Sequence, residues 1–173
     1  MATLFAGQKL RVSDLDGTAG AGFAELAADQ TANNTTTFSD STLTASVVAN
    51  ARYGFDAWVY WTSNPTADIK FGWTVPASTT GWWAAMGPVS GTAPVAGSER
   101  QNYTEYGVLS IGSSFTLAGD DEFTPTVRIC ANLRGHITVT TAGSFTLKMA
   151  QGTANLSDTI LRAGSWLNLF RLA

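Results

Sequence analysis

Charged residues are scarce in this chain. They make up 13% of its 173 residues, with only three lysines and four glutamates. Globular proteins carry about 25% charged residues, and the surfaces of soluble proteins are about a quarter to a third charged. Long surface helices depend on lysine, glutamate, glutamine and arginine. The composition therefore disfavours a helical protein, and we expect other protein to cover much of the surface.

Cysteine and histidine are almost absent. The chain contains one of each, Cys130 and His136. One cysteine cannot form an intrachain disulfide, and the two residues are too few for a structural zinc site of cysteine and histidine ligands. We expect no metal and no cofactor.

Long apolar runs and a basic stripe are also missing. No segment approaches 18 consecutive apolar residues, and residues 1–10 lack the basic start and apolar core of a signal peptide. The net charge is −3 and the pI is about 4.9. We therefore predict neither membrane insertion nor nucleic-acid binding.

A catalytic constellation is not recognisable. His136 is the sole imidazole, and no Gly-x-Ser-x-Gly nucleophile elbow is present. The acidic run 120–122 reads as a solvated turn, and Asp14 and Asp16 read as turn residues. We predict that the chain is not an enzyme, although Asp40, Asp56 and Asp68 could still meet in space.

The chain is rich in threonine, glycine and aromatic residues, with 24 Thr, 17 Gly and 19 aromatic side chains among 173 residues. Beyond residue 35 its apolar residues alternate with a period of two, which is typical of strands. The expected strands are 43–49, 52–62, 68–75, 81–87, 105–111, 114–117, 126–133, 135–140, 144–149, 155–161 and 165–172. Short strands at this spacing predict a β-sandwich or barrel. Residues 135–140 and 144–149 are expected to pair as a hairpin through 141–143.

The first 35 residues differ from the rest. They are rich in alanine and glycine, with room for a helical turn or two around residues 23–28. We predict an N-terminal arm at 1–35 that does not fold alone, followed by a β-sandwich at 36–173. The large apolar residues of its first half are candidates for docking onto another protein: Leu4, Phe5, Leu10, Val12 and Leu15.

Adjacent aromatic residues must point to opposite sides of a strand. Trp82 and Trp83 form such a pair, as do Tyr60 and Trp61, so some rings face outward. An outward tryptophan in a charge-poor protein favours a subunit interface over a platform for stacking carbohydrate. The candidate interface residues are Trp82, Trp83, Trp166, Phe170 and Leu172.

Two segments resemble a known group of proteins. Residues 6–15, AGQKLRVSDL, resemble the start of many virion proteins of phages that infect actinobacteria. Residues 137–167, with AGSFTLKMAQ and AGSWL, resemble the closing strands of their jelly-roll domains, which are similar in plan to trimeric tumour-necrosis-factor-like jelly rolls. The two segments cover about a third of the chain.

The resemblance implies an all-β jelly-roll sandwich with a short extended arm. It also implies a virion structural protein, made in the host bacterial cytoplasm and placed on the capsid exterior. The leading hypothesis is a homotrimeric capsid decoration protein, whose partners are the major capsid protein and copies of itself. The alternative is a tail-tip or fibre domain that binds carbohydrate of the host wall through its outward aromatic residues.

Overall fold

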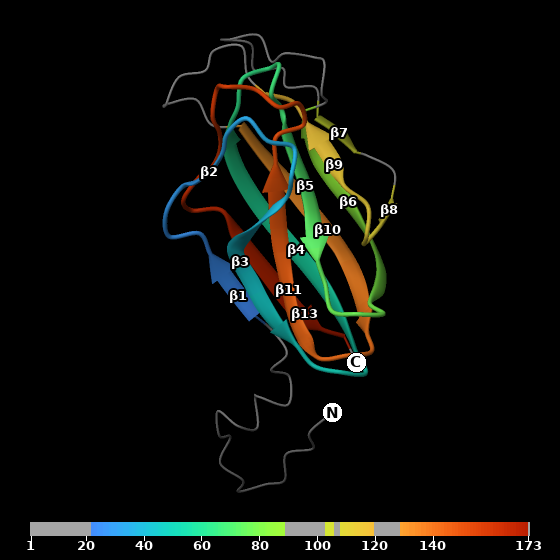
Figure 1. Cartoon of the computed structure of the whole chain (residues 1–173). Helices are drawn as coiled ribbons and strands as arrows, with labels where there is room; N and C mark the ends of the chain where they lie inside the picture. Colours follow the sequence, from blue (N-terminus) through green and yellow to red (C-terminus); the bar gives the residue numbers. More distant parts are fainter. Residues whose placement is uncertain (1–21, 89–102, 106–107, 120–128, 173) are drawn as a thin grey trace, which may run out of the picture.

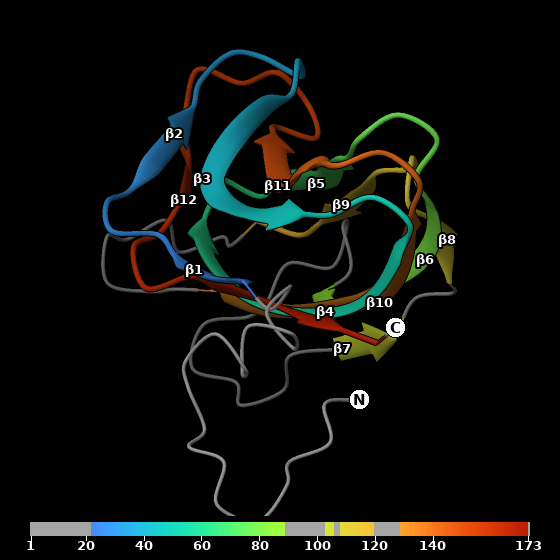
Figure 2. The same cartoon turned by 90° about the horizontal axis from the view of Figure 1, so that it is seen from below.

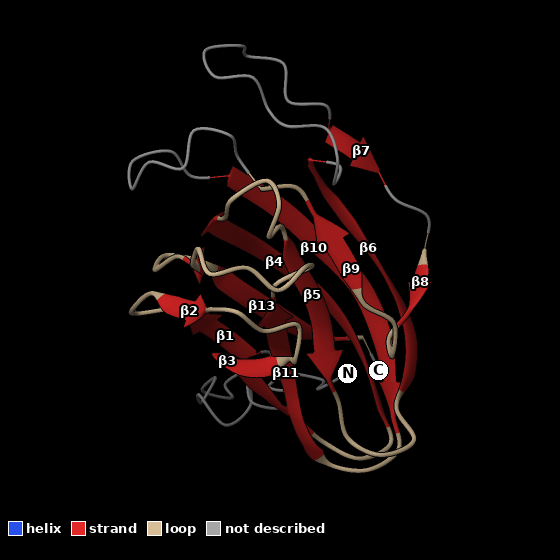
Figure 3. Ribbon diagram, turned by 45° about the horizontal axis from the view of Figure 1, so that its top comes forward, coloured by secondary structure: helices blue, strands red, loops and turns tan. Residues whose placement is uncertain are grey.

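The computed structural model describes residues 22–88, 103–105, 108–119 and 129–172. These parts of the chain consist of strands and loops and contain no helix (Figure 3). The docking candidates of the arm, Leu4, Phe5, Leu10, Val12 and Leu15, lie outside the described residues. The all-β class predicted from the sequence is confirmed.

The strands in chain order are β1 (Gly22–Glu25), β2 (Gln30–Ala32), β3 (Ser39–Val47), β4 (Ala51–Thr62), β5 (Ile69–Thr74), β6 (Thr80–Pro88), β7 (Tyr103–Glu105), β8 (Leu109–Ser110), β9 (Phe115–Leu117), β10 (Ile129–Val139), β11 (Gly143–Ala150), β12 (Thr159–Leu161) and β13 (Trp166–Arg171).

The strands form two antiparallel sheets that pack face to face (Figures 1 and 2). The small sheet has the order β3-β11-β5-β9, and the centre of the large sheet has the order β4-β10-β6, with β7 and β8 both pairing with β6. When β7 and β8 are counted as one strand, β3 to β11 become eight strands with the orders 1-8-3-6 and 2-7-4-5. This is the double Greek key of a jelly roll, as predicted.

Both ends of the described chain extend the large sheet beyond β4. Strand β13 pairs with β4, β1 pairs with β13, and β12 pairs with β4 and β2. Residues 22–35, which the sequence assigns to the arm, thus contain two strands of the sandwich. The helical turn expected at residues 23–28 is wrong, because Gly22–Glu25 is held in an antiparallel ladder against residues 166–169.

Strand β10 corrects two further expectations. Residues 126–133 and 135–140 were predicted as separate strands, but Ile129–Val139 is continuous, with Gly135 in register between Phe55 and Trp83. The glycine allows a close approach, since a Cβ there would lie 2.2 Å from the Trp82 carbonyl oxygen. The predicted hairpin is also wrong: β10 pairs with β4 and β6, whereas β11 pairs with β3 and β5 in the other sheet. The connection at 140–142 passes between the sheets.

Aromatic rings fill the space between the sheets. Trp73 stacks on Phe145 with ring centroids 4.5 Å apart and an angle of 11° between the rings, and Trp83 meets Trp73 edge-on at 5.9 Å. Trp61 meets Phe71 in the same way at 5.9 Å. Such contacts add to the hydrophobic stabilisation of a core. The inward side chains of both sheets are therefore fixed.

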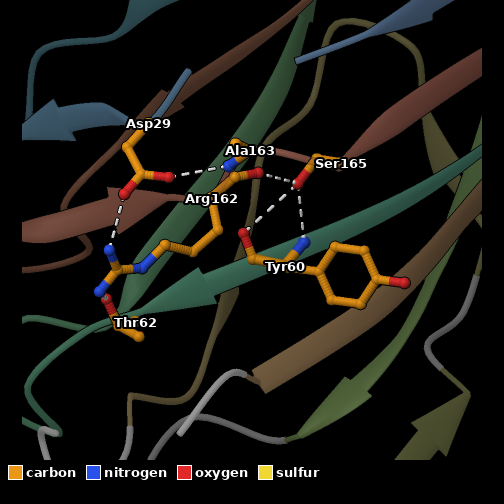
Figure 4. Close-up of polar contacts among 6 residues, drawn as sticks. All are labelled: Asp29, Tyr60, Thr62, Arg162, Ala163 and Ser165. Carbon is orange, nitrogen blue, oxygen red and sulfur yellow. Dashed lines mark hydrogen bonds and ion pairs between the residues drawn. The ribbon is translucent and has the colours of Figure 1, made fainter. Parts of the chain in front are cut away.

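Strand β4 changes its partner along its length. Residues 61–62 pair with β12, whereas residues 53–58 pair with β13. At the change, the Tyr60 backbone N–H donates to Ser165 Oγ at 2.9 Å (Figure 4). The Arg162 N–H donates to the Tyr60 carbonyl at 2.8 Å. The loop before β13 thus satisfies backbone groups that the ladder leaves unpaired.

The loop between β1 and β2 is bound to the same loop before β13 through Asp29. Asp29 accepts from Arg162 Nη1 at 2.7 Å and from the Ala163 N–H at 2.8 Å (Figure 4). Arg162 Nη2 also donates to Thr62 Oγ1 at 2.8 Å. The Arg162 side chain is largely buried, so this clamp connects the loop to the body of the sandwich.

Candidate interaction surface

The outer face of the small sheet is polar. Its outward side chains are hydroxyl or charged groups: Thr42, Thr44, Ser46, Lys70, Thr74, Ser144, Thr146 and Lys148. The Phe38 ring on this face is covered by two cations, since the ammonium groups of Lys70 and Lys148 each lie 4.8 Å from its ring centroid. This composition is typical of a face that meets water.

The outer face of the large sheet, in contrast, exposes large apolar side chains among its polar ones. Six of the eight large hydrophobic residues that are exposed in the described part of the chain belong to this face or to its rim: Phe23, Trp82, Met86, Val108, Phe170 and Leu172. Three partly exposed aromatic side chains join them: Trp58, Tyr60 and Trp166. We call these nine residues the aromatic face. Contiguous exposed apolar groups of this kind mark interaction sites.

Cross-strand register arranges the middle of this face in three rows that run across β13, β4, β10 and β6. The two outer rows are Trp166, Trp58, Asn132 and Met86 on one side, and Phe170, Gly54, His136 and Trp82 on the other. The row between them has small or polar side chains: Asn168, Asp56, Arg134 and Ala84. The Phe170 ring lies over Gly54, where a Cβ would come within 2.4 Å of it.

Three side chains of this region form a hydrogen-bond relay. Arg134 Nε donates to Asn132 Oδ1 at 2.7 Å, and Asn132 Nδ2 donates to Asp56 Oδ1. Asn132 Nδ2 also lies 3.3 Å from the Ala57 carbonyl, and the residue is buried. The relay fixes the guanidinium through one of its nitrogens. Among the described residues, the terminal nitrogens of Arg134 have no hydrogen-bond or ion-pair partner.

Two depressions meet at Arg134. One has a volume of about 560 Å³ and is lined by Trp82, Trp83, Ala84, Val108, Arg134, Gly135 and His136. The other has about 400 Å³ and is lined by Phe55, Asp56, Arg134, Gly135 and Phe170. They share Arg134 and Gly135 as lining residues, so they adjoin each other at Arg134.

The structure separates the predicted interface residues into two groups. Trp82 is 51% exposed, and Phe170 and Leu172 are 43% and 52% exposed on the same face. Trp166 is partly exposed and stacks on Phe23 at 6.3 Å. Trp83 is only 1% exposed, so its ring belongs to the core rather than to a surface.

The sequence did not single out the relay of Asp56, Asn132 and Arg134. A signal was present, because Asn132, Arg134 and His136 alternate along one side of their strand. The partner Asp56 lies about 76 residues away, and only strand pairing brings it close.

Asp40, Asp56 and Asp68, which could have formed a cluster of carboxylates, lie apart in the structure. Asp40 accepts from Thr74 on the outer face of the small sheet, and Asp56 lies on the opposite face of the molecule. Asp68 is buried at the start of β5 and accepts from the Gly119 N–H. Within the described ranges no three His, Cys, Asp or Glu side chains gather into a metal site, and no helix is suited to crossing a bilayer.

No protein-family model matches the sequence, and no curated protein is similar to it. Solved structures with some likeness include the VP2 subviral particle of infectious bursal disease virus, with a TM-score of 0.23 and 9% identity over 88% of this chain. The structure of the Gx strain of that virus gives a TM-score of 0.22 and 11% identity over 87% of this chain. This chain spans about two fifths of the length of those proteins, 41% and 40% respectively. The jelly-roll assignment rests on the strand order itself.

Proposed function

We propose that this chain is a virion structural protein, a homotrimeric decoration protein that binds the assembled phage head and stabilises it. The observation that carries the proposal is the contrast between the two outer faces of the sandwich. One face is built from hydroxyl and charged groups, and the other exposes aromatic rings. A monomeric protein in water derives no stability from exposed aromatic rings, so such a face indicates contact with a partner.

The contact between copies is assigned to the half of the aromatic face on β1, β13 and β4. Its members are Phe23, Trp166, Phe170 and Leu172. Strand β13 anchors Trp166 and Phe170, because Leu167 and Leu169 on its other side are fully buried in the core. These side chains are already about half buried, so covering each of them stabilises a complex by about 1 kcal/mol. Rigid anchors also lose little conformational entropy when a partner covers them.

The partner on the phage head is the major capsid protein, bound through Leu4, Phe5, Leu10, Val12 and Leu15. The resemblance of residues 6–15 to the start of phage virion proteins supports this assignment. A protein that binds the assembled lattice and not its separate subunits stabilises the lattice by mass action. The proposal also includes a position of the jelly roll on the capsid exterior.

Cryo-electron microscopy of intact virions tests the proposal. We expect threefold density on the outside of the head that fits the jelly roll, with the aromatic half of β1, β13 and β4 at the contacts between copies. Density on the tail alone would contradict the decoration role and favour the tail-tip or fibre alternative.

A further inference from the structure

We infer that the depression around Trp82 and Arg134 binds a sugar unit of a polysaccharide. The sugar site, as we call it, consists of Trp82, Ala84, Val108, Arg134 and His136. It occupies the β10, β6 and β8 side of the aromatic face, two strands (Arg134 and His136) to three strands (Trp82 and Ala84) away from Phe170 on β13. The inference holds for a protein on the head or on the tail.

Trp82 supplies a flat apolar platform. Half of its surface is exposed, and its neighbour Trp83 anchors the strand beneath it. The Trp83 ring is buried against Trp73, and its Nε1 donates to the Ser110 carbonyl at 3.2 Å. A sugar ring has C–H groups on its faces and hydroxyl groups around its edge. The C–H face therefore matches an exposed indole, which is apolar over its body.

Arg134 supplies hydrogen bonds at the edge of that platform. Its Nε is held by Asn132, which is held in turn by Asp56. This contact orients the guanidinium, and its terminal nitrogens, which have no partner among the residues that the structure describes, are donors only. They require an oxygen acceptor, which a sugar hydroxyl or a sugar carboxylate provides.

The size of the depression fits a small polar ligand. Its volume of about 560 Å³ falls within the range of about 300–1,000 Å³ that is usual for ligand sites. The second depression adjoins it at Arg134 and is also lined by Asp56 and Phe170, so it borders the proposed contact between copies.

A protein side chain is a poorer occupant of this depression. An apolar side chain placed on Trp82 would bury the guanidinium of Arg134 without an acceptor, and leaving a charge unpaired in an interface is costly. A sugar offers an apolar face to the indole and oxygens to the arginine at the same time. The combination of both groups in one depression favours carbohydrate over a second copy of the chain.

The test is calorimetric titration of the full chain with three probes, preceded by a bacterial-glycan array. The probes are chitotetraose, maltotetraose and tetragalacturonate, which are N-acetylated, neutral and acidic respectively. We expect at least one glycan from the array or the probe set to bind. Trp82→Ala and Arg134→Met should each weaken that binding at least tenfold, and Leu156→Ala, at an exposed apolar residue outside the aromatic face, should leave it unchanged.

Three results would overturn the inference. The first is that neither the array nor any of the probes shows binding to the wild type. The second is that binding survives in Trp82→Ala, with near-ultraviolet circular dichroism showing that the variant is folded. The third is that Trp82→Ala dissociates the oligomer and leaves glycan binding intact, which would identify a second copy as the occupant. None of these results depends on where the protein sits on the virion, so the proposed function is tested separately.

Discussion

Trp82 and Trp83 are consecutive in the chain and lie on opposite sides of β6, one 51% and the other 1% exposed. Their contributions to stability should differ accordingly. Removing a buried tryptophan costs about 3–5 kcal/mol, because the cavity that remains collapses only in part. Exposed substitutions usually stay within about 0.5 kcal/mol. We expect Trp83→Ala to lower the free energy of unfolding by about 4 kcal/mol and Trp82→Ala to leave it nearly unchanged, as measured by urea denaturation. Equal losses in the two variants would show that this assignment of the faces is wrong.

Phe170→Glu should disrupt association between copies. The ring is 43% exposed on the same side of β13 as Trp166, and a carboxylate at this position would have to be desolvated in the contact. We expect self-association to weaken at least tenfold in sedimentation velocity experiments. Leu156→Glu is the matched control, because Leu156 is 81% exposed and lies outside the aromatic face. If Phe170→Glu sediments like the wild type, the contact lies elsewhere.

Gly135→Ala should destabilise the large sheet. A methyl group at this position would meet the Trp82 carbonyl oxygen at 2.2 Å and the Trp83 Cα at 2.9 Å, and backbone atoms cannot turn away as a flexible side chain can. We expect a loss of about 1–3 kcal/mol in the free energy of unfolding, as is usual for overpacking. Gly112→Ala is the control, since no atom lies within 4 Å of the Cβ it would add. A stable Gly135→Ala variant would argue against the close approach of β6 and β10.

Asp29→Ala should loosen the beginning of the sandwich. The substitution removes the ion pair with Arg162 and the acceptor of the Ala163 N–H. Asp29 is partly exposed, so we expect a stability loss of only about 1 kcal/mol. Hydrogen exchange at residues 22–32 should speed up while exchange in β10 stays slow. Asp40→Ala, on the other sheet, serves as the control, and unchanged exchange at 22–32 in Asp29→Ala would contradict the clamp.

Deleting residues 1–16 should separate binding to the head from folding. The complete strand order of the jelly roll is contained in residues 22–172, so the truncated chain should keep its circular dichroism spectrum and its unfolding transition. Its occupancy on purified heads should fall to background in a cosedimentation assay. Decoration at wild-type occupancy would refute the role of Leu4, Phe5, Leu10, Val12 and Leu15.

Several strands could be predicted from local pattern because their side chains alternate between core and surface. This holds for β4, β5, β6 and β13, whose bounds the alternation predicts to within one or two residues. Strand β1 could not be found in this way. Its Ala- and Gly-rich sequence has weak local preferences, and it is extended because β13, more than 140 residues later, offers a ladder to it.

The amino-acid sequence by itself determined the all-β class, the scarcity of charge, and the fact that Trp82 and Trp83 point in opposite directions. These properties depend on composition and on a period of two, which are local. Only the tertiary structure decided which of the two rings is exposed. Alternation puts the rings on opposite sides of the strand, but the packing of the second sheet determines which side is buried. The tertiary structure also decided that β10 and β11 part into different sheets, and that Arg134 is oriented by Asp56. Both outcomes depend on contacts between residues far apart in the chain, which no local pattern encodes.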